Sequence, residues 1–504
     1  MGRHAPAVDR IWAPFRLPDS PELEGIDVYV GDRHVWSSPV SASYVENGER
    51  IWGFPIGMSL GLRGTGEMIV RRRPDGAEIG RYPVDCARGS SDELVLRTGR
   101  GADGIVNKWG NLAVPVQRDP EMQQRMLDHT SSLMEALKEF GLRPFLMAGM
   151  LLGAVRDGDL LPHEEDGDIG YVSSATTPAD MMLESFRLER FLAERGFESL
   201  RHSGTHLQID FVREGRHEAN VDVFGGFYLD DWFIQPFQVR ARIPREALEP
   251  TGRVVLRGVE FDSLADPEPW LEANYVTGWK VPDPAFRFVT APESARRMLG
   301  WFGAFNGQRE FWEIYYGYAE AGRGGPSAAA KRLARNRSGR PVIDLGCGTG
   351  DDAVFLAQQG RRVIAIDASK RATNTTRERT EGLDVEVIRM NLVERRQVLD
   401  FIVDAQIDEA DILVHRVLES LPGEERDNAL LIARHLAGSR GEVHVGIVDR
   451  PDEGFTGADP RTWWIERAEI ENRARGMGFE LYGWRASREG ARNIATAVMT
   501  RRQA

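Results

Sequence analysis

Cysteine is scarce in this sequence, because Cys86 and Cys347 are the only two among 504 residues. They lie far apart and neither has a CxxC partner. This excludes a disulfide framework and gives no sign of a structural zinc site built on thiolates. A chain with so few thiols is suited to reducing conditions.

Long apolar runs are also missing. No run approaches the roughly 20 apolar residues that a helix needs to cross a bilayer. The first residues, MGRHAPAVDRIWAPF, lack the apolar stretch and small-residue cleavage site of a secretory signal. We therefore expect no membrane span and a cytoplasmic location.

Positively charged residues are fewer than negatively charged ones. The sequence has 64 Lys and Arg residues against 77 Asp and Glu residues, and its formal net charge is −13. General binding to nucleic acid needs clusters of Lys and Arg that release phosphate counterions. The balance argues against a nucleic-acid partner and favours small charged substrates.

The chain is longer than one hydrophobic core supports, because single cores stop growing near roughly 250 to 300 residues. We expect an α/β multidomain protein with domains at 1–117, 118–300 and 301–504. Residues 1–117 alternate short apolar runs with turn residues, which predicts a β-rich accessory domain. Its aromatics would suit acceptor or glycan recognition, and a docking or structural module explains the pattern as well.

Two carboxylates stand close together in LMAGMLLGAVRDGDLLPHEEDGDI, where Asp166 and Asp168 follow the glycine turn at Gly149. Residues at i and i+2 share one face of a strand, so this pair can share a hard cation such as Mg²⁺. Such a cation neutralises substrate phosphates, and the spacing therefore predicts phosphate chemistry. The plainer interpretation of HEEDGD is a solvated acidic loop.

The elements around this pair are predicted from hydrophobic periodicity. We expect a helix over 119–140, a buried strand over 144–148, a helical LLGAVRDG and then the acidic strand. Two later strand-like runs, HLQIDFV and ANVDVFGGFY, each carry one acid at the centre, Asp210 and Asp222. Either acid is a candidate third ligand.

This part of the chain, roughly 118–290, resembles the LicD and fukutin-like family of the nucleotidyltransferase fold. The positions that match its GTLLGA-x-R, Pro and Asp-x-Asp pattern are Gly149, Leu151, Leu152, Gly153, Ala154, Val155, Arg156, Pro162, Asp166, Asp168 and Ile169. A second match lies in PWLEANYVTGWKVP, where Tyr275, Trp279 and Pro282 resemble the closing signature of the family.

The resemblance implies an α+β nucleotidyltransferase-like domain that moves a phosphorylated alcohol from a CDP-activated donor to a sugar hydroxyl, with CMP leaving. Asp166 and Asp168 would hold Mg²⁺ or Mn²⁺. Asp222 sits where the family places its third acid, so we prefer it to Asp210; it would complete the metal site or accept the proton of the attacking hydroxyl. Arg156 would contact donor phosphate oxygens or anchor the acids through a structural pair.

There are three departures from the family pattern, at four positions. Met150 replaces the usual small hydroxyl residue, Glu164 and Glu165 replace aspartates, and Gly167 stands between the two acids. An inactive relic that keeps the fold without turnover is the alternative to an active transferase.

A second segment, VIDLGCGTG at 342–350, contains three glycines that follow an apolar strand. The next strand, RRVIAIDAS, ends in Asp367, at the distance expected for an acid that accepts hydrogen bonds from both ribose hydroxyls of a nucleoside. Further strands, VEVIRMNL, DILVHRV and GEVHVGIV, follow, and FELYGWRAS with RNIATAVMT is predicted as a final antiparallel pair.

Residues 310–504 resemble the class I S-adenosylmethionine-dependent methyltransferases, which implies a Rossmann-like domain. In such a domain Gly346, Gly348 and Gly350 would let the methionine part of the cofactor lie against the backbone. Asp344 would orient its amino group, directly or through water, and Asp367 would hold the ribose.

Two polar residues and one aromatic run have open roles in this resemblance. Asn391 would accept a hydrogen bond from the adenine amino group or make an ordinary strand-end turn. His415, followed by Arg416, would take a proton from the methyl acceptor or serve only in structure. The aromatics of FWEIYYGY would cover the cofactor or pack in a core.

Together these features predict a bifunctional enzyme that tailors a glycan or surface polysaccharide. One domain would act as a phosphotransferase with a CDP-linked donor, and the other would transfer a methyl group to the glycan or its phospho-substituent. In one alternative hypothesis only the methyltransferase is active, and the LicD-like domain binds nucleotide or glycan without catalysis. A second alternative hypothesis makes the first two domains a scaffold for glycan recognition.

Overall fold

The computed structural model describes residues 15–86, 93–98, 101–107, 110, 112–113, 120–161, 164, 166–213, 216–236, 239–275, 278–283, 286, 288, 290–306, 309–317, 324–450, 460–489 and 492–502. The chain divides into two compact units, Met1–Gly303 and Ala304–Ala504, and each is described by itself. Among the described residues, every helix is too short or too polar to cross a bilayer. The domain limits at 117/118 and 300/301 stay predictions.

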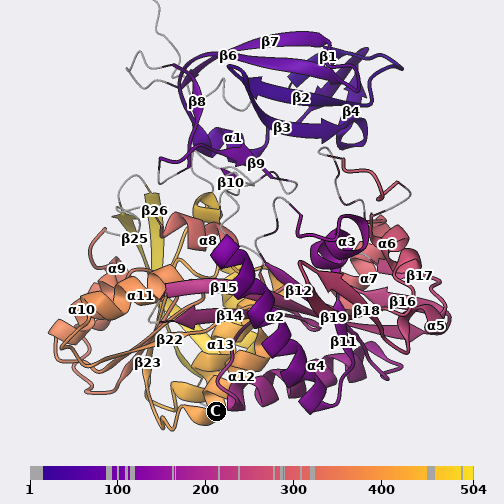
Figure 1. Ribbon diagram of the computed structural model, residues 1–504. Helices are drawn as coiled ribbons and strands as arrows, with labels where there is room; N and C mark the ends of the chain where they lie inside the picture. The colour runs from indigo at the N-terminus through magenta and orange to yellow at the C-terminus, as the bar shows by residue number, and fades with distance from the viewer. Residues whose placement is uncertain are drawn as a thin grey trace, which may run out of the picture. The chain divides into compact units, whose positions relative to one another are not determined.

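The first part of unit one consists mainly of strands (Figure 1). These elements are β1 (Phe15–Pro18), β2 (Gly25–Val30), β3 (Arg33–Pro39), β4 (Ser43–Glu46), β5 (Glu49–Trp52), α1 (Ile56–Gly61), β6 (Leu62–Arg73), β7 (Glu78–Cys86), β8 (Val95–Leu96), β9 (Ile105–Val106) and β10 (Leu112–Ala113). Strands pair in the orders β3-β2-β6-β7 and β1-β5-β4. Alternate residues of β2 are buried in the core of these strands.

The second part of unit one mixes helices with a sheet. Its elements are α2 (Pro120–Phe140), β11 (Pro144–Leu146), α3 (Ala148–Arg156), β12 (Gly167–Val172), α4 (Pro178–Glu194), β13 (Glu198–Ser203), β14 (His206–Arg213), β15 (Arg216–Leu229), β16 (Trp232–Gln235), β17 (Val239–Ala241), α5 (Arg245–Leu248), β18 (Gly252–Leu256), β19 (Val259–Ser263), α6 (Glu268–Tyr275) and α7 (Pro292–Phe302). The sheet runs β11-β12-β15-β14-β13, and β12 is parallel to β15.

Helices α2 and α4 lie against this sheet (Figure 1). A side chain at Gly167 would place its Cβ 2.5 Å from Thr130 Oγ1 on α2 and 3.0 Å from Val221, so this glycine faces the helix. Successive side chains of a strand point to opposite faces, and Asp168 therefore points away from α2. The departure at Gly167 is thus explained by close packing of the strand on the helix.

Unit two is a doubly wound sheet. Its elements are α8 (Arg309–Tyr315), α9 (Ala328–Leu333), β20 (Val342–Leu345), α10 (Asp351–Gln358), β21 (Val363–Asp367), α11 (Lys370–Arg379), β22 (Val385–Arg389), α12 (Arg395–Asp404), β23 (Asp411–His415), α13 (Arg426–Leu436), β24 (Val443–Ile447), α14 (Arg467–Gly476), β25 (Phe479–Glu489) and β26 (Arg492–Arg501). The strand order is β22-β21-β20-β23-β24-β26-β25. The first five are parallel, and β25 with β26 forms the predicted antiparallel pair.

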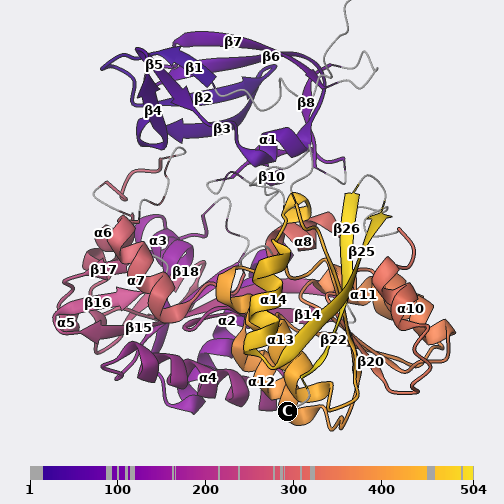
Figure 2. The same ribbon diagram turned by 180° about the vertical axis from the view of Figure 1, so that it is seen from behind.

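Both faces of this sheet are covered, because its central strands are apolar on both sides. Ile343 and Leu345 join a core with α12, α13 and α14, whereas Val342 joins a core with α9 and α10. Figure 2 shows the two groups of helices on opposite sides of the strands. Because β20, β21 and β23 are parallel, their carboxyl ends lie together at one end of the sheet. Doubly wound sheets bind ligands at this end.

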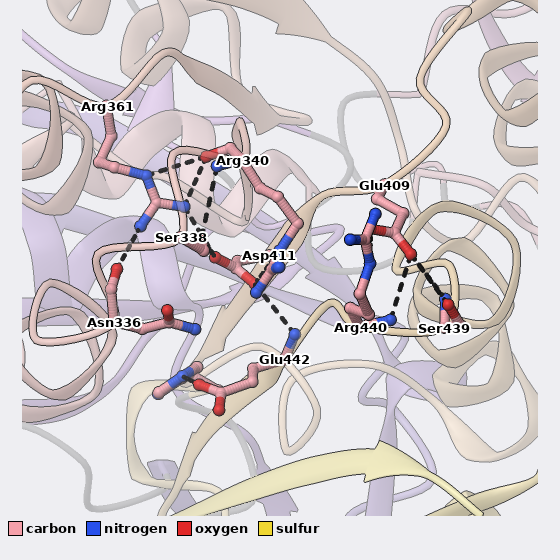
Figure 3. A network of polar contacts seen from close by, with 10 residues as sticks. Asn336, Ser338, Arg340, Arg361, Glu409, Asp411, Ser439, Arg440 and Glu442 are labelled. Atoms are coloured by element: carbon pink, nitrogen blue, oxygen red, sulfur yellow. Dashed lines mark hydrogen bonds and ion pairs between the residues drawn. The ribbon is translucent and has the colours of Figure 1, made fainter. Parts of the chain in front are cut away.

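A buried network of ion pairs and hydrogen bonds lies at the opposite ends of these strands, where β23 begins (Figure 3). Asp411 has a fully buried side chain, and its carboxylate accepts hydrogen bonds from Arg361 (2.7 Å), Arg340 (3.1 Å) and Ser338 (2.8 Å). The backbone N–H of Glu442 adds a further bond at 3.0 Å. Burial opposes ionisation of Asp411, but these donors together lower its pKa. The network ties β23 to the segment before β20 and to β24.

Candidate functional site

Asp168 on β12 and Asp222 on β15 are register partners of two parallel strands. Paired residues of neighbouring strands project from the same face, so the two carboxylates emerge side by side on the face that turns away from α2. Asp166 lies one residue before β12 begins at Gly167. The prediction that both acids lie on the strand is therefore wrong for Asp166, which stands in the bend that leads into it.

The turn predicted at Gly149 is wrong, because Gly149 lies in the first turn of helix α3, and this helical turn supports Asp168. Gly149 donates its N–H to Asp168 Oδ2 at 3.2 Å, and the Asp168 N–H points to Met150 Sδ at 3.3 Å. A side chain at Gly149 would place its Cβ 1.9 Å from Glu164 Oε2, so a larger residue here would displace the Glu164 carboxylate. Glu164 therefore lies over this turn, and Met150, a departure from the family pattern, contributes its sulfur to the support of Asp168.

Tyr275 joins the same cluster from the end of α6. Burial raises the pKa of its phenol well above the usual range, and the negative charges of Asp168 and Glu164 raise it further. Arg156, whose charge opposes that effect, pairs with Asp157 at 2.8 Å and donates to the carbonyl of Trp279 at 3.3 Å. Arg156 thus makes a structural pair, and its contact with a donor phosphate stays a prediction.

Within the described residues, the one group of three His, Cys, Asp or Glu ligand atoms that converges is formed by His202, His206 and Asp222, with every pair within 4.8 Å. The predicted set of Asp166, Asp168 and Asp222 does not form such a group in this structure, and its metal role stays a prediction. Sequence reasoning missed both histidines. The sequence did contain one indication of this site: His202 and His206 stand on either side of SGT, which is a turn between two strands.

Asp210, the other candidate third ligand, lies opposite Asn220 rather than beside Asp168. It accepts a hydrogen bond from Gln208 Nε2 at 2.7 Å. Of the two candidate acids, Asp222 is therefore the one beside Asp168.

In unit two, the glycines of VIDLGCGTG shape the wall of a cavity of about 780 Å³. Gly346, Gly348 and Gly350 have φ angles of 74°, 54° and 84°, which L side chains rarely adopt. A Cβ at Gly346 would lie 2.3 Å from Val417 Cγ2, and one at Gly348 would lie 2.9 Å from the Tyr316 hydroxyl. At these three positions the loop can therefore bring its backbone close to a ligand.

Two buried acids line this cavity. Asp344 is 2% exposed, and its Oδ2 has no hydrogen-bond partner among the described residues. Burial, with the charges of Asp352 and Asp367 nearby, raises the pKa of Asp344 well above its usual range. An ammonium group would satisfy this oxygen, so the position fits the amino group of S-adenosylmethionine.

Asp367 closes β21 beside the glycine loop. Its Oδ2 accepts the N–H of Gly348 at 3.0 Å and its Oδ1 accepts the N–H of Ser369 at 2.9 Å. Burial raises its pKa, and these two donors oppose the rise. Each oxygen keeps a lone pair for a ribose hydroxyl, as the predicted role requires.

Asn391 lines the cavity after β22, and its side chain is engaged within the protein. Its Nδ2 donates to the carbonyl of Phe305, and its Oδ1 accepts the N–H of Val393 at 3.1 Å. The second bond is the turn role that the sequence left open. Contact with adenine stays a prediction.

His415, at the end of β23, pairs with an acid that sequence reasoning missed. Its Nε2 lies 2.9 Å from Glu489 Oε2 on β25, and both residues line the cavity. Burial opposes ionisation of Glu489, but the hydrogen bond with His415 leaves its pKa lowered. Glu419, also in the lining, is 3% exposed, and burial raises its pKa. Two acids, Glu419 and Glu489, thus line the cavity close to His415.

The aromatic run covers part of the cavity. Trp312, Tyr315 and Tyr316, at the end of α8 and just after it, contribute to the lining. Arg461 lies over the rings of Phe311 and Tyr315, 5.8 and 5.2 Å from their centroids. These residues wall the cavity rather than fill a core.

The chain contains two recognisable domains. Residues 141–263 match the model of the LicD/FKTN/FKRP nucleotidyltransferase domain, and residues 342–441 match that of a methyltransferase domain. Together with the sheet order of unit two, these matches define a chain that joins a LicD domain to an S-adenosylmethionine methyltransferase domain with a Rossmann-like fold.

The similar proteins include several methyltransferases. A cypemycin N-terminal methyltransferase of Streptomyces sp is 43% identical over 54 residues, which are 11% of this chain and 22% of that protein. The CcbJ methyltransferase of Streptomyces caelestis is 19% identical, with a TM-score of 0.31, over 40% of this chain and 98% of the other. The 1,6-didemethyltoxoflavin-N1-methyltransferase of Burkholderia thailandensis is 16% identical, with a TM-score of 0.31, over 44% and 94%.

Proposed function

We propose that the chain is a bifunctional glycan-tailoring enzyme. Unit one transfers a phosphorylated alcohol from a CDP-activated donor to a sugar hydroxyl, and unit two methylates the glycan or its phospho-substituent. The observation that carries the first activity is the placement of Asp168 and Asp222 side by side on one face of the sheet, with the turn at Gly149 fixing Asp168.

The residues of unit one suit a divalent cation. Mg²⁺ or Mn²⁺ held by Asp166, Asp168 and Asp222 would supply neutralisation of the diphosphate and of the leaving CMP. Asp222 is also placed to accept the proton of the attacking hydroxyl, because it lies on the same face as Asp168. Tyr275 stays protonated at neutral pH, so its hydroxyl can donate to a phosphate oxygen beside these acids.

In unit two the cofactor would supply an electrophilic methyl group. Asp344 would hold its ammonium, the glycine loop would accept its methionine part, and Asp367 would hold the ribose. His415, held by Glu489, is placed in the lining to take a proton from the acceptor. A cytoplasmic location and glycan partner belong to the same proposal.

A two-readout assay with the full chain tests both halves. The protein is incubated with Mg²⁺, S-adenosylmethionine, an acceptor glycan and a panel of CDP-linked choline, ethanolamine, glycerol and ribitol. CMP and S-adenosylhomocysteine are then quantified by chromatography. Release of both supports the bifunctional enzyme. S-adenosylhomocysteine alone supports the methyltransferase with a binding LicD domain, and the absence of both products across the panel contradicts the proposal.

A further inference from the structure

We propose that His202, His206 and Asp222 form a binding site for one divalent transition-metal ion of the class that takes imidazole nitrogen, such as Zn²⁺. The three residues offer ligand atoms that all lie within 4.8 Å of one another. The proposal goes beyond phosphotransfer by unit one and stands without it, because metal binding is measured independently of turnover.

The distances fit a common ion. His206 Nε2 lies 3.3 Å from Asp222 Oδ2. Two ligands of a tetrahedral zinc ion lie about 3.4 Å apart, given metal–ligand distances of about 2.1 Å. The rings of His202 and His206 are stacked, with centroids 4.5 Å apart and an angle of 16° between their planes. A metal ion lies in the plane of each imidazole that binds it, so one of the two rings must turn before both can bind the same ion.

The turn that carries the histidines is rigidly held. Arg201 has a fully buried side chain that donates to the carbonyls of Ser203 and Gly204, both at 3.1 Å. Its charge is balanced by Glu189 at 2.9 Å. These bonds fix the hairpin between β13 and β14, where His202 is the penultimate residue of the first strand and His206 begins the second. A site with little freedom binds a metal with little loss of entropy.

A second contact orients the His202 ring. His202 Nε2 lies 3.0 Å from Gln208 Oε1, and Gln208 Nε2 in turn donates to Asp210 at 2.7 Å. Histidines that bind metals commonly donate their other ring nitrogen to an oxygen of this kind, which leaves one nitrogen for the ion. His206 is held from another side by Phe224, whose ring stacks on it at 4.1 Å.

The ligand set distinguishes this site from a magnesium site. Imidazole suits zinc, copper, iron and nickel, whereas magnesium prefers carboxylates, carbonyls and water. Asp222 is also one of the three acids proposed to hold magnesium, and it lies beside Asp168, so the two proposed sites share this one ligand. The competing explanation is that His206 only donates a hydrogen bond to Asp222 and that no metal binds.

Zinc binding by the full chain separates these explanations. Protein stripped with a chelator is titrated with Zn²⁺ in competition with a chromophoric chelator, and Co²⁺ absorption reports nitrogen ligation. We expect one tight equivalent that His202→Ala weakens by at least about tenfold, since even the loss of a supporting contact costs that much. His206→Ala and Asp222→Asn should weaken it as well.

The matched control is His129→Ala, which removes a histidine that pairs with Glu218 at 3.1 Å elsewhere in the same unit. This variant should bind zinc like the wild type. Circular dichroism and thermal unfolding identify any variant that fails to fold; His202 is only half-buried and is therefore the decisive position. Absence of a tight equivalent in the wild type, or equal affinity in the folded His202→Ala variant, overturns the proposal.

Discussion

Asp168 and Asp222 come from distant parts of the sequence and meet as register partners of β12 and β15. Two carboxylates that leave one sheet face side by side repel each other, and a divalent cation relieves that repulsion. The relationship links the fold of unit one to its proposed chemistry, because the parallel pairing of these two strands alone creates it.

Substitution of the third acid should discriminate between the two candidates. Asp222→Asn should lower CMP release from the CDP donor by at least about a hundredfold, because a charge aimed at the reacting phosphate is lost. Asp210→Asn should retain most of the activity, since Asp210 lies opposite Asn220 and bonds to Gln208. Steady-state CMP release measures both. Equal loss in the two variants would contradict the assignment of Asp222.

Cofactor binding by unit two should depend on Asp367. S-adenosylhomocysteine at about 100 times its dissociation constant should stabilise the wild type by about 2.7 kcal/mol. Asp367→Ala should remove most of this stabilisation, because the carboxylate that faces the ribose is gone. Asp384→Ala, an exposed acid just before β22, should keep it. Thermal unfolding with and without the ligand reads the difference, and full stabilisation of Asp367→Ala would exclude the ribose role.

Methyl transfer should depend on the His415–Glu489 pair. His415→Gln should lower the rate by about 10² to 10⁴ if the imidazole takes a proton in the transition state. Glu489→Gln should lower it less, because the ring remains but loses its carboxylate partner. Both variants should still bind S-adenosylhomocysteine. Unchanged methylation by folded His415→Gln would assign the histidine to structure alone.

The Asp411 network should control the stability of unit two (Figure 3). Asp411→Asn should cost about 3 kcal/mol, because Arg361, itself 7% exposed, is left buried without its counter-charge. The measurement is urea unfolding of the transition that S-adenosylhomocysteine stabilises.

The loss of stability at acidic pH should depend on the same network. The pKa of Asp411 is lower in the folded protein than its usual value, so its stabilisation is present above about pH 4 and is lost as pH falls through the folded pKa. The Asn variant should lose less stability over that range. Glu409→Gln is the control: hydrogen bonds from Arg440 and Ser439 lower the pKa of Glu409 to about 2, but its partner Arg440 is exposed to water. The loss of Glu409 should matter less at pH 7, and an Asp411→Asn protein as stable as the control would contradict the assignment.

The sheet of unit two could be predicted in detail because its signals are local. Each parallel strand is a short apolar run, and the glycines that need positive φ directly follow the first of them. Asp367 was found from its distance to that turn. Glu489 was not, since it reaches His415 only through the pairing of the last two strands, 74 residues further along the chain.

The site of unit one was less predictable. The pattern located Asp168 and Asp222, but placed Asp166 on the strand that it only precedes. His202 and His206 escaped because they come beside Asp222 only through the pairing of β13 with β14 and of β14 with β15. No local pattern in the sequence shows which strands pair.

The location of a bound cation beside CDP tests the central claim most directly. A crystal of the full chain grown with CDP and Mn²⁺ should give anomalous density within about 2.2 Å of carboxylate oxygens of Asp168 and Asp222, with the diphosphate on the same ion. Manganese bound elsewhere, or CDP bound with both carboxylates turned to solvent, would contradict phosphoryl transfer at this site.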